Sequence, residues 1–154
     1  MSPLSAVAVF STEKACGGTV TVKGKSAEND VTGTFEEATE HIVPIYGLYN
    51  NDTTEVVITL DDGTSATFEV TTEDIGVDYG TIQTEMKSEA SYDYSNLTFV
   101  CSTMGTLYGV DAAGDIRFFT NIGGTLGVHQ LENGHLLMPA SYVLKSSYYK
   151  EGKD

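Results

Sequence analysis

Basic residues are scarce in this chain, and the scarcity excludes whole classes of partner. Eight Lys and Arg residues stand against 22 Asp and Glu, which gives a formal net charge of −14. Nucleic acids and anionic membranes are bound by clustered Lys and Arg, so we expect the chain to bind neither. Arginine occurs once, at Arg117, and one guanidinium cannot build a cluster around phosphate or sulfate. The acidity is most simply a device for solubility.

Cysteines and long apolar runs are also few. Cys16 and Cys101 fit no metal-binding spacing, and they leave open either a disulfide in an oxidising compartment or two buried thiols. No run approaches the roughly 18 apolar residues that a membrane-spanning helix needs, so we predict no membrane span. The pattern of a signal peptide is missing as well, and we expect any such signal to have been removed or to lie upstream.

Apolar and polar residues alternate with period two over much of the first half, which is the pattern of half-buried β-strands. Clear examples are LSAVAVF (residues 4–10), TVTVKG (residues 19–24) and TEVVITL (residues 54–60). Asp61-Asp62-Gly63 then supplies the positive φ of a tight turn before a returning strand over residues 65–70. Strands at this spacing predict an antiparallel, immunoglobulin-like β-sandwich over residues 1–75.

Two short segments interrupt that pattern. Pro44 cannot donate a hydrogen bond to a ladder, so HIVPIY (residues 41–46) should lie at a sheet edge or be broken there. TFEEATEH (residues 34–41) could form one helical turn at most, and no other segment predicts a helix. The chain is therefore expected to be all-β.

A second group of strands follows a segment rich in Gly, Asp and Ser, which we predict to be a linker over residues 76–96. NLTFVCST, TLYGVD and DIRFFT indicate short strands, and a further hairpin surrounds Glu132-Asn133-Gly134. Turns such as Asp111-Ala112-Ala113-Gly114 separate them. Several short antiparallel strands with a strand–Asp–x–x–Gly–strand pattern are typical of a β-propeller blade. We predict an incomplete propeller, about one blade, over residues 97–154.

Few residues could carry chemistry. His129 and His135 flank one turn and could share a metal, but a third ligand is missing. His41 precedes a strand and is expected to hydrogen-bond locally. No nucleophile motif or phosphate-binding loop occurs. We therefore predict no catalytic residue, no metal site and no cofactor.

Several stretches resemble the bacterial aryl-sulfate sulfotransferases. SPLSAVAVFSTEKACGGTVTVKGK and HIVPIYGLYNNDTTEVVITLDDG resemble the start of that family, with HIVPIYGLY (residues 41–49) the most specific piece. VDAAGDIRFF and LENGHLLMP resemble its first propeller blade. The resemblance covers nearly the whole chain, but only the amino-terminal part of the family.

The resemblance implies a β-sandwich leading into a propeller, in a secreted or periplasmic enzyme. The family transfers a sulfuryl group from a phenolic sulfate ester to a phenol through a histidine, assisted by other histidines and an arginine that face the propeller channel. No position here matches those residues, and Asp111 and Asp115 would partly neutralise Arg117. The chain is therefore expected to be an auxiliary, inactive amino-terminal fragment, with donor and acceptor binding only to the full-length enzyme.

Two further expectations concern partners. The alternative function is a free-standing secreted β-sandwich module, with the tyrosines of SYDYSN and KSSYYK touching a glycan or a protein. A lone blade would also expose the apolar side chains of IRFF and HLLM. Either the sandwich folds over these side chains or two copies pair, and we favour a homodimer.

Overall fold

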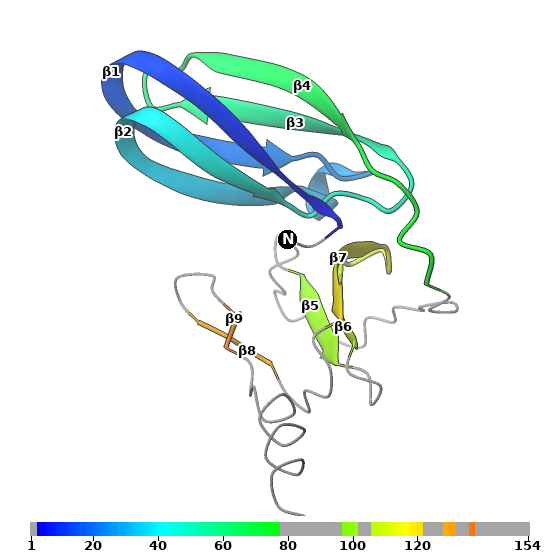
Figure 1. The fold of residues 1–154 in the computed structure, drawn as a ribbon. Helices are drawn as coiled ribbons and strands as arrows, with labels where there is room; N and C mark the ends of the chain where they lie inside the picture. Colours follow the sequence, from blue (N-terminus) through cyan, green and yellow to red (C-terminus); the bar gives the residue numbers. More distant parts are fainter. Residues whose placement is uncertain (1–2, 78–96, 102–105, 122–127, 132–135, 138–154) are drawn as a thin grey trace, which may run out of the picture.

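The computed structural model describes residues 3–77, 97–101, 106–121, 128–131 and 136–137, and these form an all-β protein, as predicted (Figure 1). Among the described residues, no helix is long and apolar enough to cross a membrane. The strands are β1 (Ser5–Val22), β2 (Val31–Tyr46), β3 (Thr53–Leu60), β4 (Ser65–Thr71), β5 (Thr98–Cys101), β6 (Thr106–Val110), β7 (Ile116–Asn121), β8 (His129–Gln130) and β9 (Leu136–Leu137), and a 3-10 turn spans Ala27–Asn29.

The first four strands form the sandwich, in the order β2-β1-β3-β4. Residues 5–11 of β1 pair with residues 40–46 of β2. After a register irregularity, residues 18–22 of β1 lie between residues 31–35 of β2 and residues 56–60 of β3. The long β1–β2 hairpin therefore folds over itself. It contributes a two-stranded layer (residues 5–11 and 40–46) that faces a four-stranded layer (residues 31–35, residues 18–22, β3 and β4), as Figure 1 shows.

Glycine permits this fold-over at one close approach. A Cβ on Gly18 would lie 2.3 Å from the carbonyl oxygen of Thr59, so any side chain there would push β3 away. The sequence pattern ended its first strand at Phe10, whereas β1 continues through this irregularity to Val22. A bulge breaks the alternation of inward and outward side chains, and this is why period two did not reveal the continuous strand.

The core lies between the two layers and follows the predicted alternation. Val43 and Ile45 point inward from the two-stranded layer, and Val22, Val56 and Ile58 meet them from the four-stranded layer. Each fully buried aliphatic side chain of this size contributes about 1.5–3 kcal/mol relative to an exposed one. Apolar burial is therefore what holds the sandwich together.

The predicted hairpin between β3 and β4 is confirmed. The amide of Gly63 donates to the carbonyl of Leu60 over 2.9 Å, and Gly63 has a φ of 87°. These features are typical of a three-residue loop that ends in a left-handed glycine. Pro44 also lies where the sequence placed it, at an edge, because its strand segment pairs only with β1.

Two expectations in β2 were wrong. Residues 34–41 form no helical turn, because they are part of the strand Val31–Tyr46. His41 does not precede a strand but lies inside this one, opposite Phe10 of β1. Long-range pairing with β1 overrides the weak helical preference of the Glu-rich segment.

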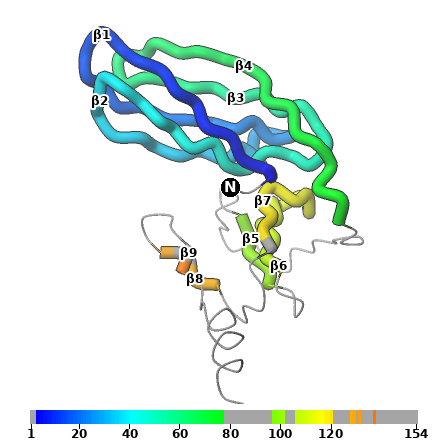
Figure 2. Tube along the Cα trace, in the orientation of Figure 1, coloured from blue at the N-terminus to red at the C-terminus, as the bar shows by residue number. Residues whose placement is uncertain are grey.

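The second group of strands forms the antiparallel meander β5-β6-β7 and a short β8–β9 pair. The strands lie where the sequence predicted them, and the β6–β7 turn ends in Gly114 with a φ of 91°. Figure 2 shows β7 beneath the amino-terminal end of β1, and Ile116 and Phe119 belong to the same buried cluster as Leu4. The sandwich therefore covers these two side chains of IRFF. Beyond Val77, the predicted linker lies outside the described residues.

Candidate functional site

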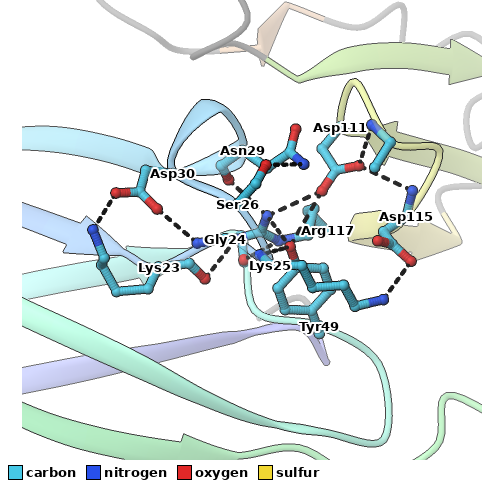
Figure 3. Close-up of polar contacts among 12 residues, drawn as sticks. Lys23, Gly24, Lys25, Ser26, Asn29, Asp30, Tyr49, Asp111, Asp115 and Arg117 are labelled. Atoms are coloured by element: carbon cyan, nitrogen blue, oxygen red, sulfur yellow. Dashed lines mark hydrogen bonds and ion pairs between the residues drawn. The ribbon is translucent and has the colours of Figure 1, made fainter.

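The most unusual side chain of the chain is its only arginine. Arg117 is the second residue of β7, and its exposed fraction is 0%. A buried charge is very costly unless partners satisfy it. Its side chain leaves the β7 strand toward the sandwich, where polar groups converge on it (Figure 3).

Three backbone carbonyls of the sandwich accept hydrogen bonds from the guanidinium. Nε donates to the carbonyl of Gly47 over 2.6 Å, and Nη1 donates to the carbonyl of Asn29 over 2.8 Å. Nη2 lies 3.4 Å from the carbonyl oxygen of Lys23. These carbonyls come from the ends of β1 and β2 and from the turn between them, so one side chain of β7 ties together the lower end of the sandwich.

Asp111 supplies the opposite charge and has two tasks. Its Oδ2 accepts from Nη1 of Arg117 over 3.1 Å, with both side chains buried. Its Oδ1 accepts from the amides of Ala113 and Asp115, each over 3.0 Å, which closes the β6–β7 turn. Because the turn itself fixes the carboxylate, Asp111 presents its second oxygen to Arg117 in a set orientation.

The ring of Tyr49 lies against the Arg117 guanidinium. The guanidinium carbon of Arg117 lies 3.8 Å from the centre of the tyrosine ring, a cation–π contact. The Tyr49 hydroxyl accepts from Nη1 of Arg117 and from the amide of Lys25, each over 2.9 Å, and it lies 3.4 Å from Oδ2 of Asp111. Burial raises the pKa of the Tyr49 phenol. The phenol therefore stays neutral between a cation and an anion.

Two glycines shape the sandwich side of the cluster. Gly47 has a φ of 89°, a conformation that strains other residues, and its Cβ would meet Val31 at 3.0 Å. A Cβ on Gly24 would lie 2.5 Å from the carbonyl group of Asn29. Both glycines therefore allow backbone segments to approach closely enough that their carbonyls point at Arg117.

An exposed ion pair lies at the edge of this cluster. Lys25 Nζ lies 2.8 Å from Oδ1 of Asp115, across the boundary between the sandwich and the meander. The hydrogen bond to Asp115 raises the pKa of the Lys25 ammonium, and burial opposes this effect. Asp115 was expected to neutralise Arg117, but it pairs with Lys25 instead, and Asp111 pairs with Arg117.

The cluster of Arg117, Asp111, Tyr49 and the carbonyls of Lys23, Asn29 and Gly47, here called the Arg117 junction, has no open face for a ligand. Every nitrogen of the guanidinium has a protein acceptor, and the side chain is fully buried. The role of the junction is therefore to hold the sandwich and the meander together. From the sequence, Arg117 was considered only as an anion ligand, although a lone arginine inside the apolar run IRFF is a signal of a buried structural charge.

The histidines do not form a site in the described part of the chain. His41 is buried in the sandwich, where its ring stacks on Phe10 with centroids 4.6 Å apart and meets the edge of Phe35 at 5.2 Å. Its Nε2 lies 3.5 Å from Oγ1 of Thr12, which is 29 positions away on the paired strand β1, so this contact is not the local hydrogen bond that was expected. His129 is exposed on β8, and His135 lies outside the described residues.

Metal and disulfide chemistry find no support either. Within the residues that the structure describes, no three His, Cys, Asp or Glu side chains group to hold a metal ion. Cys16 and Cys101 are free and partly exposed thiols, so of the two alternatives the disulfide is not formed. The tyrosine-rich segments SYDYSN and KSSYYK lie outside the described residues.

Comparison with known proteins identifies the sandwich. Residues 1–79 match the family described as the arylsulfotransferase Ig-like domain. Neither the curated proteins nor the solved structures include a match. The matched segment contains β1 to β4 and the junction residues from Lys23 to Tyr49. The resemblance seen in HIVPIYGLY is therefore confirmed, and the chain belongs to the arylsulfotransferase family through its Ig-like domain.

Proposed function

We propose that this chain is the amino-terminal part of an arylsulfotransferase, in which the Ig-like sandwich is an auxiliary domain that anchors the first blade of a β-propeller. The Arg117 junction is the observation that carries the proposal. It joins carbonyls of the family-matched sandwich to a side chain of the following meander, with a guanidinium that is fully buried. Separating the two parts would leave the buried charges of Arg117 and Asp111 unpaired, which is costly and favours a fixed arrangement.

The meander supports the assignment to a blade. Strands β5, β6 and β7 are sequential and antiparallel, and the β8–β9 pair follows them in the chain. The Asp111–Gly114 turn has the strand–Asp–x–x–Gly–strand pattern that the first blade of the family shows. In this proposal residues 1–75 form the sandwich, residues 76–96 link it, and residues 97–154 belong to the blade.

The proposed activity of the whole enzyme is that of its family. It transfers a sulfuryl group from a phenolic sulfate ester to a phenol through a histidine, in the periplasm or outside the cell. The phenolic donor and the phenol acceptor would then be partners of the full-length enzyme, and no cofactor is required. No residue of this chain is assigned a catalytic role.

The chain by itself is proposed to be inactive. Sulfuryl transfer, like phosphoryl transfer, spreads charge over three oxygens and needs converging cationic donors. The guanidinium of Arg117 is hydrogen-bonded within the junction, and His41 is buried against Phe10 and Phe35. A nucleophilic imidazole needs an accessible and electropositive pocket, and neither group is in one.

Activity is tested with the purified chain, 4-nitrophenyl sulfate and excess phenol. We expect nitrophenol release at the rate of the protein-free control, in the chain and in its His129→Ala and His135→Ala variants alike. Release above that control which disappears in either variant would contradict the proposal. Release that both variants retain would point to a contaminating sulfatase, which an independent preparation resolves.

We also propose the homodimer expected from the sequence. Its basis was the exposure of IRFF and HLLM. The sandwich covers Ile116 and Phe119 of IRFF, whereas Leu137 of HLLM is 61% exposed.

A further inference from the structure

One flank of the sandwich leaves part of its interior uncovered. Ala66 of β4 lies directly opposite Ile58 of β3, so the two side chains point to the same face of the sheet. Ile58 is buried at 6% exposure, whereas Ala66 is exposed and Phe68, two residues further along β4, is only partly buried. The two-stranded layer therefore covers β3 but not the whole core-facing side of β4.

An apolar groove lies on this flank. It has a volume of about 410 Å³ and is bounded by residues 8–12 of β1 and by core-facing side chains of β3 and β4. Phe10 lines it from one layer, and Phe68 lines it from the other, together with Ile58 and Leu60. Sites that bind small molecules are mostly apolar and measure roughly 300–1,000 Å³. The groove therefore has room for a small aromatic body, and the two phenylalanine rings favour one.

The groove is uncharged along its walls but acidic at one end. Within the described residues, none of those that line it is charged. Leu60 and Thr64 line the groove and flank the β3–β4 turn, which contains Asp61 and Asp62. The amide of Thr64 donates to Oδ1 of Asp62 over 2.8 Å, so this carboxylate is held beside the groove. The same hydrogen bond lowers the pKa of Asp62, which favours its charged form.

No cation of the described chain pairs with this acidic end. Neither Asp61 nor Asp62 takes part in an ion pair with another described residue. Lys14 follows the segment of β1 that lines the groove, but Glu13 adjoins it and offsets its charge. A positively charged group would therefore meet unpaired carboxylates at this end of the groove, whereas an anion would be repelled.

We propose that the groove binds a lipophilic cation, with a small aromatic body between Phe10 and Phe68 and an ammonium group at the end that carries Asp61 and Asp62. Burial of the aromatic body supplies most of the affinity, and the carboxylates select the sign of the charge. The site belongs to the sandwich alone. The inference therefore depends neither on the propeller assignment nor on sulfuryl transfer.

Three probes that share a naphthalene body test the charge preference. Naphthylmethylammonium, naphthylmethanol and naphthylacetate are each titrated with the full 154-residue chain, and naphthyl fluorescence reports binding. At low salt we expect the cation to bind roughly two- to fivefold more tightly than the neutral alcohol, because exposed carboxylates attract it moderately. High salt should reduce the difference. Equal affinity of the cation and the alcohol, or preference for the anion, would overturn the proposal.

Asp62→Asn tests the acidic end. The asparagine keeps a side-chain oxygen for the amide of Thr64 but removes the charge, so it should abolish much of the difference between the cation and the alcohol. Glu69→Gln is the matched control, because Glu69 lies on the same strand but faces outward, opposite Glu55. It should leave the binding of all three probes unchanged. Equal effects of the two variants would indicate a response to net charge and would overturn the proposal.

Filling the groove tests the place of binding. Ala66→Leu should weaken binding of the cation roughly tenfold, since the larger side chain occupies space that the probe needs. Thr67→Leu, which adds a leucine to the opposite face of β4, should not weaken it, and circular dichroism checks that both variants fold. The bound probe should also shift the methyl NMR signals of Ile58 and Leu60 in the parent chain.

Two further results would overturn the proposal. Binding that survives Ala66→Leu, without methyl shifts at Ile58 and Leu60, would place the probe elsewhere. Binding that is lost as the protein concentration rises would assign the groove to a second copy of the chain.

Discussion

The sandwich core and the Arg117 junction stabilise the molecule in opposite ways. In the core, Val22, Val56 and Ile45 are buried by apolar packing alone. In the junction, a guanidinium and a carboxylate are buried together and are satisfied by hydrogen bonds. Apolar packing tolerates changes that keep volume and hydrophobicity. A buried ion pair tolerates almost none, because removing one partner leaves the other charged and unpaired.

The largest expected effect is at the junction. Arg117→Met should lower the free energy of unfolding by about 3–5 kcal/mol, since it leaves the Asp111 carboxylate and three carbonyls without their donor. Urea denaturation followed by circular dichroism measures the loss. A loss below about 1 kcal/mol would contradict the role of Arg117 as a buried anchor.

The matched core variant separates the two regions. Ile45→Ala should cost about 2–5 kcal/mol through lost burial and a residual cavity. Hydrogen exchange distinguishes the two variants. Arg117→Met should speed amide exchange first in β6 and β7, whereas Ile45→Ala should speed amide exchange in β1 to β4. If both variants released the same amides, the two regions would be one cooperative unit.

Tyr49 allows a smaller test of the junction. Tyr49→Phe should cost about 1–3 kcal/mol, because the amide of Lys25 and Nη1 of Arg117 lose an acceptor. Tyr46→Phe is the control, since Tyr46 is exposed on the outer face, and it should change stability by less than about 0.5 kcal/mol. Equal losses in the two variants would argue against the buried hydrogen bonds.

Alkaline pH should also weaken the folded state. The folded protein holds the Tyr49 and Lys25 protons more tightly than the unfolded chain does, because both pKa values are raised. Above the unfolded values of 10.0 and 10.5, the unfolded state binds fewer protons, so stability falls as the pH rises. Unfolding curves from about pH 8, where both groups keep their protons in either state, to about pH 11 measure the slope, and Tyr49→Phe should reduce it.

The smallest effect is expected at the rim. Lys25→Met removes the exposed pair with Asp115 and should cost about 0–1 kcal/mol, less at high salt. Thermal unfolding at two salt concentrations checks this. A large loss that is insensitive to salt would mean that the pair is not screened by solvent.

Sequence reasoning succeeded where the determining contacts are local. The β3–β4 hairpin depends on alternation and on the Asp61–Gly63 turn, all within about 20 residues, and it was predicted correctly. Continuous β1 was missed because a bulge hides its period. Arg117 was misread because its partners Gly47 and Asn29 lie 70 and 88 positions away, and no pattern in one sequence brings them together.

The separation between Arg117 and its acceptors also bears on the order in which the chain can mature. A polypeptide emerges from its amino terminus, so the carbonyls of Lys23, Asn29 and Gly47 exist long before residue 117 follows. Until then water must solvate them, and the lower end of the nascent sandwich stays hydrated. Docking of the β6–β7 hairpin, whose own turn holds Asp111, replaces that water with the hydrogen bonds of Arg117. The guanidinium can therefore join the sandwich to the meander only after both have been synthesised.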